Sequence, residues 1–391
     1  MANEEKDSLL DNLLFWSLCL TFFFIPIATS PAVIAGLVSL AIWIFSGKFL
    51  QDRDTWLKQP WTLPIIIFML LPWAGLIWTN DVNIGLDFAT KSYYWLFAFA
   101  IASLSFQSPK TFIKAFLSGL TFTAALSLIQ FTGLIPMRKG YPAGFMGHIN
   151  HSLFIVFGLL LLSFYFRKVH YKKVKIFIFS LMLFYFLNLI VGYGRAGYLA
   201  LLISSPLIIY KIVGRRHIIK AAWVIILFIG ISILSPTVKM RIDQAVTDIK
   251  QYDTGNPNTS IGLRFYMWEG AIKIFLKNPV LGVGTGGYQK AINDYEALGL
   301  QPLHINFSQP HNSFLYMASS FGIIGIISLL WLFTVFLKKG WRARNDIVGF
   351  SVLSFGMVLI IGSLTDTQIL SLATAKMFAL LMGIKTGQNE K

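Results

Sequence analysis

Gln309-Pro310-His311-Asn312-Ser313 leads into the apolar run 314–321 and then into Gly322-Ile323-Ile324-Gly325. An imidazole and an amide thus stand at the start of an apolar helix. They follow directly on the one long polar loop of a chain that otherwise consists of membrane-length apolar runs. Titratable side chains are expensive to hold at a membrane boundary, so their presence there indicates a functional site.

The composition around this stretch is that of a membrane protein. Hydrophobic residues make up 55% of the chain and charged residues 13%, and the mean hydropathy is +0.66. Apolar runs recur about every 20 to 30 residues, close to the roughly 20 residues that cross a hydrocarbon core. We predict an all-α polytopic membrane protein with about twelve transmembrane helices. Their centres are near Leu20, Leu40, Met69, Phe97, Ala124, Leu159, Leu183, Ile203, Leu227, Ile327, Val358 and Phe378.

The net charge of +16 is concentrated in four connections that share one side of the predicted bundle if the helices alternate in direction. The positive-inside rule makes that side cytoplasmic, places both termini inside, and explains the basic excess without a nucleic-acid partner. Membrane lipids are the expected surroundings. The four clusters are Lys48, Arg53 and Lys58; Arg167, Lys168, Lys172, Lys173 and Lys175; Arg215, Arg216 and Lys220; and Lys338, Lys339, Arg342 and Arg344.

This topology divides the chain into three regions. Residues 1–235 form a membrane bundle of about nine helices, 236–311 an external loop domain, and 312–391 about three further membrane helices. Within the loop, Ser260 or Thr259 can cap an amphipathic helix over 262–276, which should end at Asn278-Pro279 because proline disfavours a helical residue before it.

A glycine-rich run, Gly282-Val283-Gly284-Thr285-Gly286-Gly287-Tyr288, follows that helix. Glycines permit tight turns and close approach of the backbone to a ligand. The run lacks the Lys-Ser/Thr ending of a P-loop and no strand precedes it. A structural turn and a phosphate cradle that includes Gly284 are both open interpretations.

Two arginines lie outside the four basic clusters. Arg195 sits in the short turn Gly192-Tyr193-Gly194-Arg195-Ala196-Gly197, and Arg264 lies on the first turn of the loop helix. Guanidinium groups bind phosphate as planar forks and stay charged, so the pair is a candidate diphosphate clamp. The alternative is that each reaches to lipid head groups or stabilises a loop.

Other polar residues have competing interpretations. Lys91 can contact a diphosphate or pair with Asp87. His148 and Asn150 begin the sixth predicted helix with His151, beside Arg138 and Lys139, where they can line an acceptor path. His304 is interpreted as a loop residue. Asp366 can pair with Lys376 within the bundle or lie at the outer surface.

No metal, cofactor or disulfide is expected. Cys19 is the only cysteine, and no acidic residue accompanies the histidines near position 150. The one Asp-x-Asp motif, Asp52-Arg53-Asp54, falls in a predicted cytoplasmic connection. Because Glu4, Glu5 and Asp7 flank Lys6, the first helix is not expected to be a cleaved signal peptide.

The order of Arg195, Arg264 and His311-Asn312, with Gly322 and Gly325 beyond them, resembles the O-antigen ligase family of bacterial lipopolysaccharide assembly. Arg264 and Trp268 form an Arg-x3-Trp pattern, and Asn278-Pro279-Val280-Leu281-Gly282-Val283-Gly284 follows it. The resemblance covers essentially the whole chain and implies a GT-C-like membrane glycosyltransferase in the bacterial inner membrane, with its large loop and active site on the periplasmic side.

The resemblance implies transfer of a glycan from undecaprenyl diphosphate to a sugar hydroxyl of lipid A-core. His311 is then the expected general base, because an unperturbed imidazole, with a pKa of about 6.5, can take a hydroxyl proton at neutral pH. Arg195 and Arg264 are the expected cations that stabilise the departing diphosphate. Asn312, Lys91, Gly284, His148 and Asn150 are the expected substrate-binding residues, and the reaction is expected to be metal-independent and inverting.

Related activities remain as alternatives. An O-antigen polymerase and a bacterial protein O-oligosaccharyltransferase share parts of the loop pattern. A lipid-linked oligosaccharide transporter is the alternative of a different class, although transporters tend to place ionisable groups near the bilayer midplane within repeats.

Overall fold

The computed structural model describes residues 2–104, 108–138, 140–213, 230, 236–296 and 307–386, and every regular element in these residues is helical. The elements before the predicted loop are α1 (Ala2–Phe24), α2 (Thr29–Phe45), α3 (Lys48–Gln51), α4 (Arg53–Leu57), α5 (Thr62–Ala74), α6 (Val82–Thr90), the 3₁₀ helix η1 (Lys91–Trp95), α7 (Leu96–Ala102), α8 (Pro109–Phe131), α9 (His148–Lys168), α10 (Lys172–Val191) and α11 (Arg195–Val213). The later ones are α13 (Pro236–Asp253), α14 (Gly262–Lys277), α15 (Gly287–Glu296), α16 (Ser313–Arg342), α17 (Ile347–Thr365) and α18 (Leu372–Gly383).

The predicted helices are present wherever the structure describes the chain. Each predicted centre lies inside a helix except Leu227, which lies outside the described residues. Five helices, α8, α9, α10, α16 and α17, are long and apolar enough to cross a membrane, and shorter apolar helices accompany them. The chain is therefore a helical membrane protein, while the number of about twelve spans stays a prediction.

The helix expected near Phe97 differs from a simple span. It is divided into α6, η1 and α7, and η1 begins at Lys91. A 3₁₀ stretch between α-helices often marks a functional region. Asp81 caps the first piece by accepting a hydrogen bond from the Ile84 N–H at 3.0 Å.

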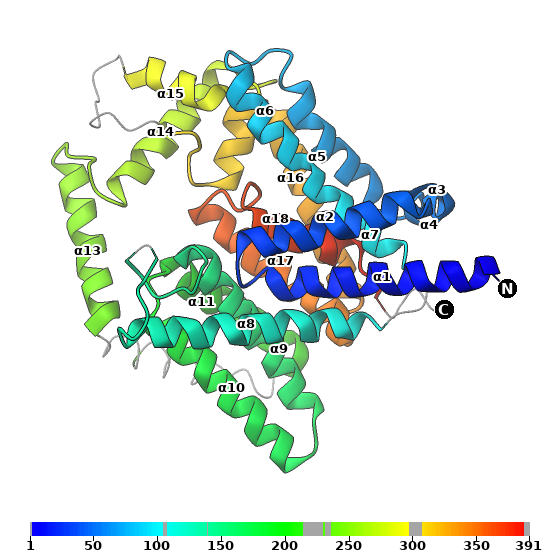
Figure 1. Ribbon diagram of the computed structural model, residues 1–391. Coiled ribbons are helices and arrows are strands. Elements are labelled where there is room, and N and C mark those ends of the chain that lie inside the picture. The colour runs from blue at the N-terminus through cyan, green and yellow to red at the C-terminus, as the bar shows by residue number, and fades with distance from the viewer. Residues whose placement is uncertain are drawn as a thin grey trace.

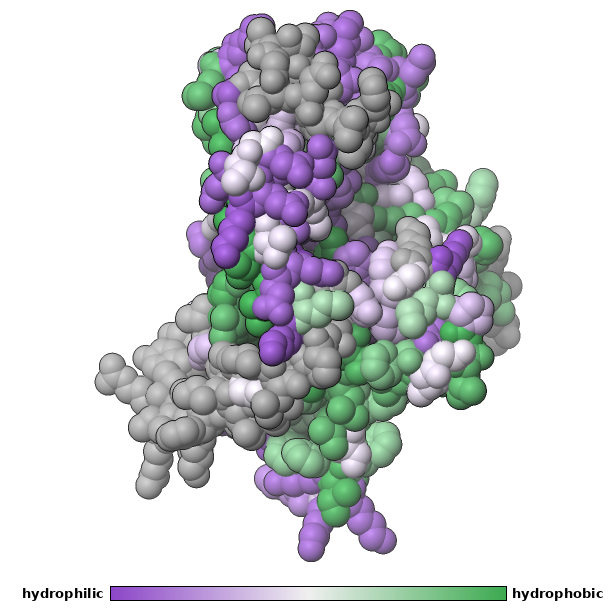
Figure 2. Space-filling model, turned by 90° about the vertical axis from the view of Figure 1, so that its left-hand side faces the viewer, coloured by the Kyte–Doolittle hydropathy of each residue, from purple (hydrophilic) through white to green (hydrophobic). Residues whose placement is uncertain are grey.

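The two ends of the molecule differ. The start of α1 lies at one end of the bundle in Figure 1, α1 packs beside α2 and α8, and the loop helices α13, α14 and α15 gather at the opposite end. Figure 2, seen from the α13 side, shows hydrophilic residues gathered over the upper and central part of this face, above a hydrophobic region. The side of the membrane on which the loop helices lie stays a prediction.

Aromatic side chains fill the bundle interior, as expected for helices that are apolar all round. Phe355 of α17 contacts Phe157 of α9, with ring centroids 5.1 Å apart, and Phe336 of α16 contacts Phe378 of α18 at 4.2 Å. α16 and α17 form an antiparallel hairpin at the centre of this packing. The end of α17 therefore returns to the start of α16, next to His311.

A glycine joins the loop to the bundle. Gly322 interrupts α16 with φ 60° and ψ −149°, and a Cβ placed there would collide with the Val280 carbonyl oxygen. The backbone on both sides of this kink pairs with the glycine-rich loop: the Val283 N–H donates to Ser319 O at 3.0 Å, and the Ile323 N–H donates to Pro279 O at 2.8 Å. The kink thus fixes the loop against the helix that begins beside His311.

Gly322→Ala should destabilise the protein more than Gly133→Ala. Both glycines have positive φ, which costs of order 1–3 kcal/mol for a residue with a side chain. Only Gly322 adds a backbone collision, because no atom lies within 4 Å of a Cβ at Gly133. Thermal unfolding of the purified variants should give the lower melting temperature for Gly322→Ala. Equal melting temperatures would show that the close approach contributes nothing.

Candidate functional site

His311 has an unusual backbone conformation. It lies two residues before α16 and is, among the described residues, the one non-glycine residue with positive φ, at 49°. Such a conformation persists only when its surroundings enforce it, and it concentrates at functional sites. Asn312 fixes the backbone next to His311, because its Oδ1 accepts from the Phe314 and Leu315 N–H groups and its Nδ2 donates to Leu364 O at 3.0 Å.

The His311 ring is held by a carboxylate. Its Nδ1 lies 2.7 Å from Asp366 Oδ1, at the end of α17. Asp366 is itself fixed, because Oδ1 also accepts from the Thr367 N–H at 2.9 Å and Oδ2 accepts from Gln368 Nε2 at 3.1 Å. With the proton on Nδ1 directed at Asp366, Nε2 keeps its lone pair, as a general base requires.

Arg264 lies near the same carboxylate. Burial lowers the pKa of the Arg264 guanidinium, and the negative charge of Asp366 opposes that shift. Guanidinium remains charged at every accessible pH. His311 is therefore in direct contact with Asp366, and Arg264 lies within electrostatic range of the same carboxylate, while the catalytic roles of both stay predictions.

Arg195 lies at the start of α11. The first turn of α11 packs against the first turn of α9, since a Cβ at Gly194 would collide with Ser152 and with the His148 carbonyl. α9 in turn contacts the segment after Asp366, because Asn150 Nδ2 donates to Ser371 Oγ at 2.8 Å. Arg195 is thus linked through α9 to the region of His311, and its contact with substrate stays a prediction.

Two interpretations of Asp366 were open, and the structure contradicts the one that pairs it with Lys376. The Lys376 Nζ donates to Ala32 O at 2.9 Å, and its side chain is fully buried inside the bundle. Asp366 pairs with His311 instead, across 55 residues of sequence. The sequence signal that could have found this pair is the break Thr365-Asp366-Thr367 after an apolar helix, because an antiparallel pair of helices brings that break back to His311.

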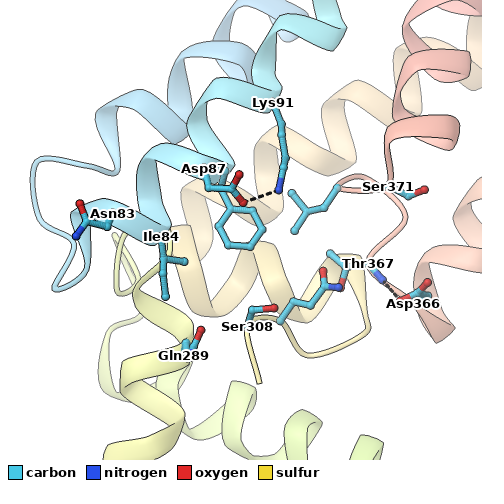
Figure 3. Close-up of a pocket in the computed structure, with 12 residues that line it drawn as sticks. Asn83, Ile84, Asp87, Lys91, Gln289, Ser308, Asp366, Thr367 and Ser371 are labelled. Atoms are coloured by element: carbon cyan, nitrogen blue, oxygen red, sulfur yellow. Dashed lines mark hydrogen bonds and ion pairs between the residues drawn. The ribbon is translucent and has the colours of Figure 1, made fainter. Parts of the chain in front are cut away.

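A pocket of about 620 Å³ opens beside Asp366. Figure 3 shows Asn83, Ile84, Asp87 and Lys91 along one wall, Gln289 of α15 and Ser308 below them, and Asp366 and Thr367 across from α6. Lys91 Nζ lies 2.7 Å from Asp87 Oδ2 and 4.8 Å from the centroid of the Phe88 ring. Of the two interpretations of Lys91, the structure favours pairing with Asp87, at a position that lines the pocket.

The remaining substrate-binding predictions have mixed outcomes. The Gly284 N–H donates to Ser320 O at 2.9 Å, which favours a structural turn over a phosphate cradle. The Asn312 Oδ1 caps α16 and its Nδ2 donates to Leu364 O, so the structure assigns Asn312 a positioning role. His148 packs its ring against Tyr141, with centroids 4.4 Å apart. Lys139 and His304 lie outside the described residues.

Metal ligation finds no support in the side-chain arrangement of the described residues. Within ranges 2–104, 108–138, 140–213, 236–296 and 307–386, no three His, Cys, Asp or Glu side chains gather closely enough to hold an ion. The cations near the site are guanidinium and ammonium groups. Metal independence of the reaction stays a prediction.

Comparison with known proteins identifies the same region. Residues 178–330, which include Arg195, Arg264, His311 and Gly322, match the family described as O-antigen ligase. The chain is 25% identical over 206 residues to an O-antigen ligase of Salmonella typhimurium, covering 49% of this chain and 46% of that protein. It is 27% identical over 135 residues to an O-antigen ligase of Escherichia coli, covering 32% and 30% of the two chains.

A third relative, from Haemophilus influenzae, carries no assigned function. It is 28% identical over 231 residues, which cover 56% of this chain and 57% of the relative. The aligned segments therefore span from about a third to just over half of the length of these curated relatives.

Proposed function

We propose that this chain is an O-antigen ligase, which transfers a glycan from undecaprenyl diphosphate to a sugar hydroxyl of lipid A-core; the match of residues 178–330 to the O-antigen ligase family supports the proposal. The observation that carries the proposal is the His311 imidazole, held at 2.7 Å by Asp366 beside a polar pocket, with Arg264 near the same carboxylate. A base, a fixed cation and a sugar-sized pocket are the parts that such a transfer needs.

His311 acts as the general base. A sugar hydroxyl is a poor nucleophile until its proton is removed, and His311 Nε2 takes that proton while Nδ1 stays bonded to Asp366. The hydroxyl oxygen forms a bond to the anomeric carbon as the bond from that carbon to the diphosphate oxygen breaks. A single displacement of this kind inverts the anomeric configuration.

The diphosphate leaves as an anion. Arg264 and Arg195 lie at the ends of different helices, α14 and α11, and their guanidinium groups form charge-assisted hydrogen bonds to the departing oxygens. Removing one preorganised donor of this kind typically costs about 10² to 10³ in turnover.

A second, mostly apolar pocket is lined by Phe68, Trp95 and Phe321, among others. It adjoins the polar pocket, since both pockets share Phe88 and Lys91.

Asp366 positions the base. Asp366→Asn should lower kcat by about 10-fold or more with a smaller change in KM, because the amide cannot hold the proton-bearing Nδ1 in the same tautomer. Turnover and KM with purified lipid-linked donor measure the effect. A structural role alone would leave the pH profile of kcat unchanged, whereas loss of the positioning carboxylate should move it.

Asp346→Asn provides the matched control. Asp346 caps the other end of α17 by accepting from the Val348 N–H at 2.9 Å, and asparagine caps a helix equally well. Its kinetics should equal those of the wild type. Equal losses in the two variants would remove the positioning role of Asp366.

Divalent metal should be dispensable. The fixed cations Arg195 and Arg264 supply the charge that a metal supplies in other transferases. Transfer measured before and after extensive EDTA treatment should therefore keep its rate. Complete loss of activity that Mg²⁺ or Mn²⁺ restores would contradict metal independence.

A deletion strain separates ligase from polymerase and transporter. A strain without the ligase accumulates long carrier-linked glycan with unmodified lipid A-core, a strain without the polymerase shows single-unit caps, and a strain without the transporter retains donor on the cytoplasmic side. The proposal predicts the first pattern. The active site then faces the periplasm, with both termini in the cytoplasm of the inner membrane.

A further inference from the structure

The pocket beside Asp366 is polar and of a size that suits sugar units. Its volume is about 620 Å³, within the range of about 300–1,000 Å³ usual for small-molecule sites. Asn83, Gln289, Ser308 and Gln309 contribute uncharged donors and acceptors to its walls. Amide and hydroxyl side chains both donate and accept hydrogen bonds, so they match sugar hydroxyls, which do the same.

The charged residues that line the pocket, among which Arg264 is not included, do not favour an anion. Two carboxylates, Asp87 and Asp366, line it against one ammonium group, Lys91. The Lys91 Nζ is engaged by Asp87 at 2.7 Å and faces the Phe88 ring at 4.8 Å. A phosphate or carboxylate on a bound sugar would therefore meet lining residues with more negative than positive charge, and would compete with Asp87 for Lys91.

We propose that this pocket binds an uncharged, hydroxyl-rich sugar unit of the substrate, and that the Asp87–Lys91 pair selects against sugars that carry phosphate or carboxylate groups. The inference rests on the proposed function, because it names the sugar class at the same site. Phe88 offers the apolar contact: the face of an aromatic ring is negative and attracts the C–H groups of a sugar ring. Asp366 at the facing wall places the bound sugar beside the carboxylate that holds His311.

Asp87 is a suitable position for a test. Its side chain is 70% exposed, so its replacement does not disturb a packed core. An exposed ion pair of this kind is worth about 0–1 kcal/mol, which corresponds to selectivity changes of up to about fivefold. Asp87→Asn keeps the shape of the side chain and releases Lys91.

The experiment measures binding directly, without catalysis. The full chain in phosphatidylcholine nanodiscs, which carry neither sugar nor net charge, is mixed with glucose, galactose and their 6-phosphates, and saturation-transfer NMR reports which sugars bind. We expect the neutral sugars to give signals and the 6-phosphates to give several-fold weaker ones. In Asp87→Asn the ratio should shift toward the 6-phosphates by about two- to fivefold, and in Phe88→Ala the neutral signals should fall.

Asp81→Asn is the matched control. It changes the same charge on the same helix, and asparagine preserves the cap that Asp81 provides for α6. Its ratio should equal that of the wild type. Absence of neutral-sugar signals in the wild type, an unchanged ratio in Asp87→Asn, or an equal shift in Asp81→Asn would each overturn the inference.

The proposed function has a separate readout. Loss of glycan transfer with sugar binding retained would count against the ligase reaction and leave the pocket assignment standing. Transfer with no sugar binding at this pocket would count against the pocket assignment and leave the ligase reaction standing.

Discussion

His311→Asn should lower the turnover of glycan transfer by about 10²- to 10⁴-fold, the contribution of a positioned base. Asparagine is the informative replacement because it tolerates the positive φ of 49° that His311 adopts, so the backbone before α16 is preserved. The Asn312 cap also stays in place. Turnover with purified lipid-linked glycan and lipid A-core acceptor is the measurement.

The KM for the donor should change little, because the imidazole acts on the acceptor proton during the chemical step. His170→Asn is the control: it removes an exposed histidine from the connection between α9 and α10. Its turnover should match that of the wild type. A folded His311→Asn variant with full turnover would exclude His311 as the base.

Arg264→Gln should reduce kcat by about 10² to 10³, the cost of removing one preorganised group that stabilises developing negative charge. Arg264→Lys should recover only part of this loss. Lysine keeps the charge but lacks the planar fork that binds phosphate oxygens in pairs. Single-turnover kinetics with undecaprenyl-diphosphate-linked glycan separate the chemical step from binding.

Lys277→Gln supplies the comparison on the same helix. Lys277 is exposed in the last turn of α14, far along the helix from Arg264 in the first turn. Its removal changes the net charge equally and should leave the rate unchanged. A similar loss in both variants would attribute the effect of Arg264 to overall charge and not to the site.

The sequence predicted the membrane helices well because hydropathy is a local property. A run near 20 apolar residues must satisfy its own backbone hydrogen bonds in lipid, and a helix does so within the run. The described residues accordingly contain helices at every predicted centre that they cover. The split at Lys91 and the kink at Gly322 were not predicted, because both depend on neighbouring segments.

The residues of the candidate site were predicted from the sequence by residue type and position. His311 contacts Asp366, and the charge of Asp366 also acts on Arg264, but the catalytic roles of these residues stay predictions. The contact between Asp366 and His311 was missed, because the sequence does not show which of several possible partners a carboxylate after an apolar helix contacts. Gly284 was open between two interpretations until its N–H was found bonded to Ser320 O.

The sequence by itself determined that this protein is a helical membrane protein. It also predicted basic clusters on one side and His311, Arg195 and Arg264 as candidate site residues, because these properties depend on composition and on neighbours along the chain. Only the tertiary structure decided which carboxylate orients the imidazole, and which side chains line the pocket beside it. The physical reason is that these residues are far apart along the chain. His311 and Asp366 meet because α16 and α17 pack as an antiparallel pair, and Asp87 lines the same pocket from α6.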